Sequence, residues 1–378
     1  MKIRKVTAAD LKLGMLIPWN VYGDNGALLV RKGHMISSAN QIAYLIERGS
    51  FEDHGEYRPE VQEPPSALRK LNAACVELPP LLQAVARRAP PPGWRRQLED
   101  IATMIHDAVS LSADIATAGV IHNQRQAPYA ARHGVNTAVV ATILAKARQR
   151  PRDEVMTVTL AALTMNLGML EHHQRWHDSS VVLDSADRAR MLAHPERSVD
   201  LLRAAGIQDE TWLSCVLHHH ENEDGTGYPL GKFGAQIPLP AKLLALADRY
   251  CARISERGYR PTVTPNAALR DMLLEARTTL DSNLASLMIR ELGIYPIGTY
   301  VRMINGEVGV VSRRGLQSTT PHVESVLGPR GAPLEVFLQR DTRSELHTIR
   351  EVLSNAQVAA LAAPPLRMEQ VWGRAAAV

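Results

Sequence analysis

The sequence predicts a multidomain, mainly α protein. A central all-α helical bundle is expected between a small N-terminal α+β module and a C-terminal β-hairpin appendage. From about residue 97 to residue 292, apolar residues recur at three- and four-residue spacing, which is typical of packed helices. Two Asn-Gly pairs between apolar runs, Asn25-Gly26 and Asn305-Gly306, indicate β-hairpins near the two ends.

The N-terminal module has the signals of one helix behind its hairpin. Ser37 or Ser38 can cap a helix that runs to about Glu47, and Gly49 is expected to end it. A polar, proline-containing stretch follows, and the run Ala89-Pro90-Pro91-Pro92-Gly93 interrupts the chain again. We therefore predict four parts: the module at 1–62, a linker with one helix at 63–96, the helical domain at 97–292 and the β-containing extension at 293–378.

Composition excludes several classes of protein. With 45% hydrophobic and 22% charged residues in 378, the chain is neither disordered nor fibrous. The 43 Lys and Arg exceed the 39 Asp and Glu by only four, so general nucleic-acid binding gains no support. No apolar run reaches the length of a membrane span and no secretory leader is evident, so we expect a cytoplasmic protein. Cys75, Cys215 and Cys251 are widely spaced, which favours buried thiols over disulfides or zinc ligands.

Histidines cluster in one part of the chain. Seven of the 14 lie between residues 172 and 220. Histidine is the commonest protein ligand for transition metals near neutral pH, so the cluster suggests a metal site. For His172, His173 and His177, which stand among charged residues, we favour a solvated polar loop over a ligand role.

The stretch that begins at His219 carries the most specific signal. It reads His219-His220-Glu221-Asn222-Glu223-Asp224-Gly225-Thr226-Gly227-Tyr228-Pro229, and it closely resembles the HHExxDGxGYP segment of the HD-GYP family. This is a bacterial group of helical, metal-dependent phosphodiesterases of the HD superfamily that hydrolyse cyclic di-GMP. The motif residues shared with the family after the two histidines are Glu221, Asp224, Gly225, Gly227, Tyr228 and Pro229. The resemblance extends from near Ile101 to Val311 and implies that the helical domain has the HD-type fold.

The resemblance also implies roles for individual residues. It assigns metal ligation to His133, His194, His219, His220 and Asp248. The family helix ends in its metal-binding aspartate, which implies that Asp248 closes a helix; an ordinary helix-end carboxylate is the less favoured interpretation. Contacts with the substrate phosphates would fall to Arg257 and Arg260, because the segment around them is similar to the family's RxYR/K motif. Divalent cations that activate a water, with arginines on the phosphate oxygens, are suited to phosphodiester hydrolysis.

The chain departs from the family at the pair that names it. Where the family has histidine, aspartate and, three residues later, lysine, this sequence has Met165, Asn166 and Met169. A further family ligand, a glutamate four residues before His133, is Tyr129 here. A neutral amide cannot offset two dications as a bridging carboxylate does, and a thioether is a poor ligand for iron(II), manganese(II) or magnesium. A normal two-metal mechanism is therefore not expected.

These residues lead to a functional hypothesis with alternatives. We predict a cyclic di-GMP signalling protein whose degenerate domain binds the nucleotide or a partner with weak or no hydrolysis. The alternative is an active phosphodiesterase with a reduced or rearranged metal site, into which His172 or His173 could be recruited. A third interpretation is an interaction module whose GYP surface contacts another signalling protein. The cofactor would be iron or manganese in fewer ions than intact relatives hold, or no metal at all. A homodimer is compatible with the apolar residues of the linker helix.

Overall fold

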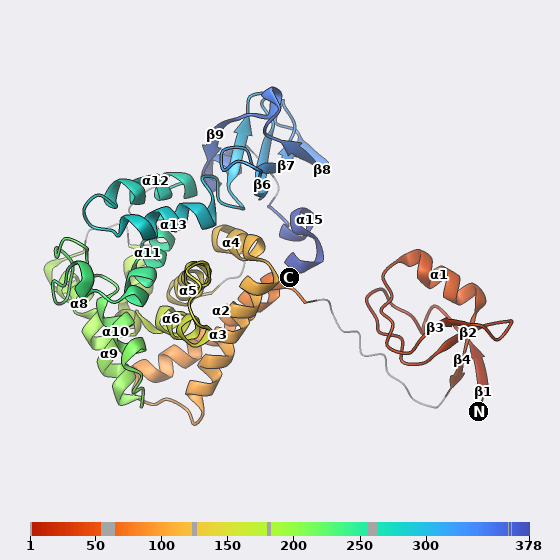
Figure 1. Ribbon diagram of the computed structural model, residues 1–378, viewed down its shortest axis with the longest axis horizontal. Coiled ribbons are helices and arrows are strands. Elements are labelled where there is room, and N and C mark those ends of the chain that lie inside the picture. The colour runs from red at the N-terminus through yellow and green to blue at the C-terminus, as the bar shows by residue number, and fades with distance from the viewer. Residues whose placement is uncertain are drawn as a thin grey trace. The chain divides into compact units, whose positions relative to one another are not determined.

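The computed structural model describes residues 2–53, 65–122, 127–179, 183–255, 263–361, 363 and 365–378 (Figure 1). The chain forms two compact units, Met1–Pro65 and Ser66–Val378. Helices dominate, and small antiparallel sheets lie near the N- and C-terminal ends of the chain. The predicted fold class is therefore confirmed.

The first unit is a four-stranded antiparallel sheet with one helix. Its sheet has the order β1-β4-β2-β3. The predicted hairpin at Asn25-Gly26 joins β2 to β3, and Gly26 has a φ of +75°, which favours glycine. Ser38 caps the helix by accepting a hydrogen bond from the backbone N–H of Gln41, as its hydroxyl predicted. The elements are β1 (Lys2–Lys5), β2 (Val21–Gly23), β3 (Leu28–Val30), α1 (Ala39–Arg48) and β4 (Gly49–Asp53).

The second unit is mainly a helical bundle around one continuous apolar core. At its centre, α5 packs against α2, α3, α6 and α11. The apolar residues of α5 cover almost its whole circumference, as expected for a helix surrounded by others. The helices are α2 (Ala67–Ala86), α3 (Trp94–Leu111), α4 (Ala113–His122), α5 (Tyr129–Ala147), α6 (Arg152–Thr164), α7 (Leu170–Asp178), α8 (Ser185–Leu192), α9 (His194–Ala204), α10 (Glu210–His218), α11 (Leu239–Ile254), α12 (Pro265–Glu275) and α13 (Ser282–Leu292), with short 3-10 turns at Leu167–Met169 and Gly234–Gln236.

Helix α2 lies in the stretch that the sequence analysis assigned to a linker. Its residues Leu71, Cys75 and Leu78 are buried in the core of the bundle, and α2 packs along α3. The proline run from Pro90 to Pro92 separates these two helices and forms the turn between them. The helix thus contributes to the second unit.

The C-terminal region is a five-stranded antiparallel sheet, larger than a hairpin alone. The predicted Asn305-Gly306 turn joins β5 to β6, and the full strand order is β8-β7-β6-β5-β9. The sheet lies beside α4 (Figure 1), where the His122 ring contacts Tyr300 edge-on and hydrogen-bonds to the Gly298 carbonyl. The elements are β5 (Tyr300–Met303), β6 (Val308–Arg313), β7 (His322–Leu327), β8 (Pro333–Asp341), β9 (Ile349–Leu353), α14 (Asn355–Ala360) and α15 (Met368–Trp372), with 3-10 turns at Glu345–His347 and Gly373–Ala376.

Two further sequence expectations concern cysteines and membrane spans. Cys75, Cys215 and Cys251 are all free and buried, which confirms the prediction of thiols packed as small apolar groups. Among the described residues no single helix is long and apolar enough to cross a membrane. The pair α3 and α4, bent by 116°, passes that test together on length and composition only.

Candidate metal centre

A cavity of about 550 Å³ lies in the helical bundle and is lined by four of the five predicted metal ligands, His133, His194, His220 and Asp248. Its walls come from the first turns of α5 and α9, from α7, α8 and α11, and from the loop after α10. The residues that line it are Tyr129, His133, Asn166, Met169, His173, Trp176, His177, Leu183, Arg188, Met191, His194, His220, Tyr228, Asp248, Arg249, Ala252 and Arg253.

Three histidines form a metal-competent cluster beside the cavity. His194 begins α9, and His219 and His220 directly follow α10. One ring nitrogen from each lies within 4.8 Å of the others. Burial lowers the pKa of His194 to about 3, and burial also lowers the pKa of His219 and of His220 below the usual value. All three imidazoles are therefore neutral at pH 7, the form that binds metal ions.

The hydrogen bonds of His194 and His219 point one lone pair of each toward a common position. Their Nδ1 atoms donate to the backbone carbonyls of Met191 and Val216, which leaves each Nε2 as an unprotonated acceptor. These two Nε2 atoms are 3.2 Å apart. Two nitrogens at that spacing, each about 2.1 Å from a shared ion, subtend about 99° at the ion, between the octahedral and tetrahedral angles. Facing lone pairs repel without a cation between them, so the donor set fits one divalent transition metal ion.

His133 and Asp248 form a second polar pair in the same cavity. His133 lies in the first turns of α5, and its Nε2 is 2.7 Å from Asp248 Oδ1. Burial raises the pKa of Asp248, but the hydrogen bond from His133 and the nearby histidines outweigh it and lower the pKa below its ordinary value. The carboxylate is thus ionised, and it is the only carboxylate among the described residues that line the cavity.

Asp248 does not close its helix. Helix α11 continues for six residues to Ile254, so the expectation drawn from the family pattern is wrong on this point. The helix extends because Tyr250 and Cys251 are buried in the core behind the site and stabilise a further turn. Asp248 therefore shares a helix face with residues one turn later.

Two of the three positions at which the chain departs from the family's His-Asp pair and lysine lie on the cavity. Asn166 and Met169 line the cavity, whereas Met165 is fully buried and absent from the lining. The Asn166 Oδ1 atom is buried and has no hydrogen-bond partner among the described residues. Gly168 between them lets α9 approach, since a Cβ there would stand 2.5 Å from the His194 carbonyl oxygen. Gly168 thus allows the candidate ligand His194 to approach, whereas the side chains of Asn166 and Met169 carry no charge.

Tyr129 occupies the position where the family pattern has a glutamate. Its ring stacks on His133 with the ring centroids 5.4 Å apart. It also stacks on His177, with centroids 3.8 Å apart. An aromatic ring therefore lies against His133 at the position where the family pattern has a carboxylate.

The loop after α10 is shaped by its motif residues. Gly227 has no room for a side chain, because a Cβ would lie 2.4 Å from the Asn222 nitrogen and 2.5 Å from the His220 carbonyl oxygen. The Tyr228 N–H donates to that same carbonyl, and the Tyr228 ring stacks on the His220 ring with centroids 4.7 Å apart. The loop thereby fixes the orientation of a candidate metal ligand.

The two acidic motif residues organise this loop. The buried carboxylate of Glu221 accepts hydrogen bonds from the Leu230 and Lys232 N–H groups, at 2.8 and 3.0 Å. Asp224 accepts from the backbone N–H and the hydroxyl of Thr226. Both carboxylates are engaged by the loop's own donors, which explains why this motif needs acidic residues at those positions.

The interpretation of His172, His173 and His177 as a solvated loop is wrong. They lie on helix α7, where His173 is buried and both His173 and His177 line the cavity beside Trp176. His172 is not among the residues that line this cavity and lines a separate, smaller one. The three- and four-residue spacing of Leu170, His173 and His177 is the sequence signal that could have identified this inward face.

The sequence analysis did not predict three arginines of the cavity, and two arginines that it did predict lie outside the described residues. Arg188, Arg249 and Arg253 line the cavity, but no motif identified them in the sequence. Arg257 and Arg260, predicted to contact phosphate, lie outside the described residues.

Comparison with known proteins defines the class of this helical domain. The HD domain family model matches residues 96–284, which is half of the chain. The chain therefore belongs to the HD domain family, within its HD-GYP group.

Two curated relatives and one solved structure are among the similar proteins. The cyclic di-GMP phosphodiesterase PA4108 of Pseudomonas aeruginosa is 29% identical over 203 residues, which are 53% of this chain and 49% of that protein. The cyclic di-GMP phosphodiesterase response regulator RpfG of Xanthomonas campestris is 29% identical over 154 residues, 40% of each chain. This chain spans half or less of the length of these relatives. Bd1817, an HDG"Y"P protein from Bdellovibrio bacteriovorus, matches 76% of this chain and 98% of its own at 14% identity and a TM-score of 0.47.

Proposed function

We propose that this protein is a cyclic di-GMP signalling protein whose degenerate HD-GYP domain binds the nucleotide in the described cavity and hydrolyses it weakly or not at all. The observation that carries the proposal is the state of Asn166. Its neutral amide oxygen is buried and has no hydrogen-bond partner in the described part of the chain, at the position where the family pattern has a bridging carboxylate. Curated relatives named as cyclic di-GMP phosphodiesterases support the ligand class.

The charge balance of the cavity argues against a full two-metal centre. Two dications need anionic ligands between them, and Asp248 is the single carboxylate on the described part of the lining. Asp248 is also hydrogen-bonded to His133. One ion held by His194, His219 and His220 fits the donors, with Asp248 as a further ligand in this proposal. A second ion has only the His133–Asp248 pair and the weak Asn166 oxygen.

The remaining lining suits a nucleotide. Tyr129, His173, Trp176 and His177 form an aromatic wall on α5 and α7. Flat aromatic faces stack on nucleobases irrespective of base identity. We propose that a guanine base stacks on this wall, and that Arg257 and Arg260 contact a phosphate as the family resemblance implies.

A second function is favoured by the histidine cluster itself. Three neutral histidines that leave a coordination position open can hold one metal ion, which lowers the pKa of a bound water. Such a centre would support a single-ion phosphodiesterase that adds water across one P–O bond and releases the linear dinucleotide. This alternative predicts turnover in the absence of a second ion.

The deciding experiment measures binding, metal content and turnover on the same purified full-length protein. Cyclic di-GMP is supplied anaerobically with iron(II) or manganese(II), and Asp248→Ala is measured alongside. We expect nucleotide binding, about one metal ion per chain and negligible hydrolysis. Robust turnover that disappears in Asp248→Ala would refute the degenerate-domain proposal and establish the alternative. Failure to bind the nucleotide would refute both and direct attention to a protein partner at the GYP surface.

Restoring the family residues provides a matched gain-of-function test. The triple variant Met165→His, Asn166→Asp and Met169→Lys restores the two ligands and the lysine of the family pattern. The backbone at these positions need not change. We expect metal content to rise toward two ions per chain and hydrolysis to increase. The single variant Met165→His is the control, because it supplies no bridging carboxylate. Unchanged metal content in the triple variant would show that these positions do not limit the site.

A further inference from the structure

Two arginines on α11 line the cavity directly beside Asp248. Asp248, Arg249, Ala252 and Arg253 all line the cavity, and Arg249 and Arg253, four residues apart, lie on the same face of the helix. No motif in the sequence assigned a role to either arginine.

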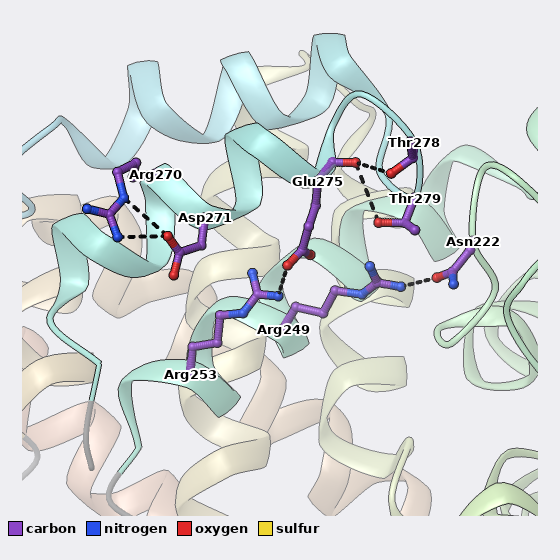
Figure 2. A network of polar contacts seen from close by, with 8 residues as sticks. All are labelled: Asn222, Arg249, Arg253, Arg270, Asp271, Glu275, Thr278 and Thr279. Carbon is purple, nitrogen blue, oxygen red and sulfur yellow. Dashed lines mark hydrogen bonds and ion pairs between the residues drawn. The ribbon is translucent and has the colours of Figure 1, made fainter. Parts of the chain in front are cut away.

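Each guanidinium is oriented by a contact from another element (Figure 2). Arg249 Nη2 donates to Asn222 Oδ1 in the loop that carries the GYP motif. Arg253 Nη2 donates to Glu275 Oε1 at the end of α12, at 2.5 Å. The Glu275 carbonyl is near the hydroxyls of Thr278 and Thr279, at 3.5 Å each, in the turn that ends this helix. The arginines are thus held in place before any ligand binds.

These contacts leave donor capacity and positive charge unused. Arg253 Nη1 is buried and has no hydrogen-bond partner among the described residues. A guanidinium carries five N–H donors, and burying one without an acceptor is costly. The cavity lining holds three arginines against one aspartate, and Glu275 beside the lining is paired with Arg253, so a formal excess of one positive charge remains when the histidines are neutral. Such a cavity attracts an anion.

We propose that Arg249 and Arg253 form a phosphate-binding pair, with Arg253 as the principal contact, which positions one phosphate of the cyclic dinucleotide next to the metal centre. This inference rests on the proposed function and names the residues that hold its ligand. Arginine donates two parallel hydrogen bonds to a phosphate, which lysine cannot do. The pair also supplies cationic charge to a cavity in which Met169 stands at the lysine position of the family pattern.

The test replaces each member of the Arg253–Glu275 ion pair in turn, because we expect the two replacements to have different effects on the affinity for cyclic di-GMP. Binding of cyclic di-GMP to the full-length protein is measured by calorimetry at low ionic strength. We expect Arg253→Gln to weaken binding roughly 10- to 100-fold, as for loss of a charge-assisted hydrogen bond. Glu275→Gln removes the competing carboxylate, so affinity should be kept or increased. If the Arg253–Glu275 pair served only to hold helices together, the two variants would weaken binding to a similar degree, and that result would overturn the proposal.

A control and a second probe separate this inference from the proposed function. Arg270 on α12 is exposed and paired with Asp271 (Figure 2), so Arg270→Gln should leave binding unchanged. Inorganic phosphate is titrated into metal-free protein as the second ligand. If wild-type protein binds cyclic di-GMP and Arg253→Gln binds it equally well, the arginine inference fails while the function stands. If wild-type protein binds phosphate through Arg253 but does not bind cyclic di-GMP, the anion site stands and the proposed function fails. Binding of neither ligand overturns both.

Discussion

Replacing His219 by glutamine should abolish most of the stabilisation that a metal ion gives this fold. Glutamine can still donate to the Val216 carbonyl, but it removes the Nε2 lone pair that faces His194 at 3.2 Å. An ion at 100 times its dissociation constant stabilises the folded state by about 2.7 kcal/mol. If the lost ligand lowers metal affinity about 100-fold, the same ion concentration gives only about 0.4 kcal/mol.

The assay is urea unfolding of wild-type and variant protein with manganese(II) and with a chelator. His218→Gln is the matched control, because His218 is also buried at the end of α10 but bonds to Ser214 and lies outside the cluster of His194, His219 and His220. We expect the control to keep the full metal-dependent gain. An equal gain in His219→Gln and wild type would show that the histidine cluster does not hold the ion.

Three further predictions concern the loop, a buried histidine and the C-terminal sheet. Gly227→Ala should lower the free energy of unfolding by roughly 1–3 kcal/mol and weaken metal binding, because the added Cβ would meet backbone atoms at 2.4–2.5 Å. The measurement is urea unfolding. Gly134→Ala is the control, because a Cβ at Gly134 would have its nearest neighbours at 3.7 Å. Burial lowers the pKa of His122 to about 4, so the unfolded chain takes up a proton below pH 6.5 while the folded chain stays neutral. Stability should therefore fall by about 3 kcal/mol from this residue as the pH drops from 6.5 to 4, and unfolding of His122→Gln across that range should show a shallower decline. Glu307→Gln should cost about 1.5–3 kcal/mol, since the largely buried carboxylate accepts two hydrogen bonds from Arg340 and one from Ser325; equal thermal stability of variant and wild type would contradict this.

Local sequence signals predicted much of the architecture because they depend on neighbouring residues. Hairpins at Asn25-Gly26 and Asn305-Gly306, and a helix capped by Ser38, follow from backbone preferences and short-range hydrogen bonds. The five-stranded C-terminal sheet was predicted only as a β-hairpin appendage. Pairing of β5 with β9 joins segments about 50 residues apart, and no local pattern indicates such a partner.

The same distinction applies to the candidate site: residues within one continuous motif were predicted, whereas residues placed by the packing of separate helices were not. The GYP segment identified His219 and His220 because their spacing and glycines lie in one continuous stretch. His173 was assigned to a solvated loop because of its polar neighbours, whereas its inward direction depends on how α7 packs against α5. Arg249 and Arg253 gave no signal at all, because an arginine near a helix end is usually solvent-exposed.

The sequence by itself determined the class of this protein and the residue types at its centre. It specified the helical domain, the histidines and the neutral replacements at Asn166 and Met169. The tertiary structure decided which of these groups meet, since the 3.2 Å approach of His194 to His219 and the bond from His133 to Asp248 each join separate helices. Spacing along a chain sets the face of one helix, whereas a site requires several helices to bring their faces to the same cavity.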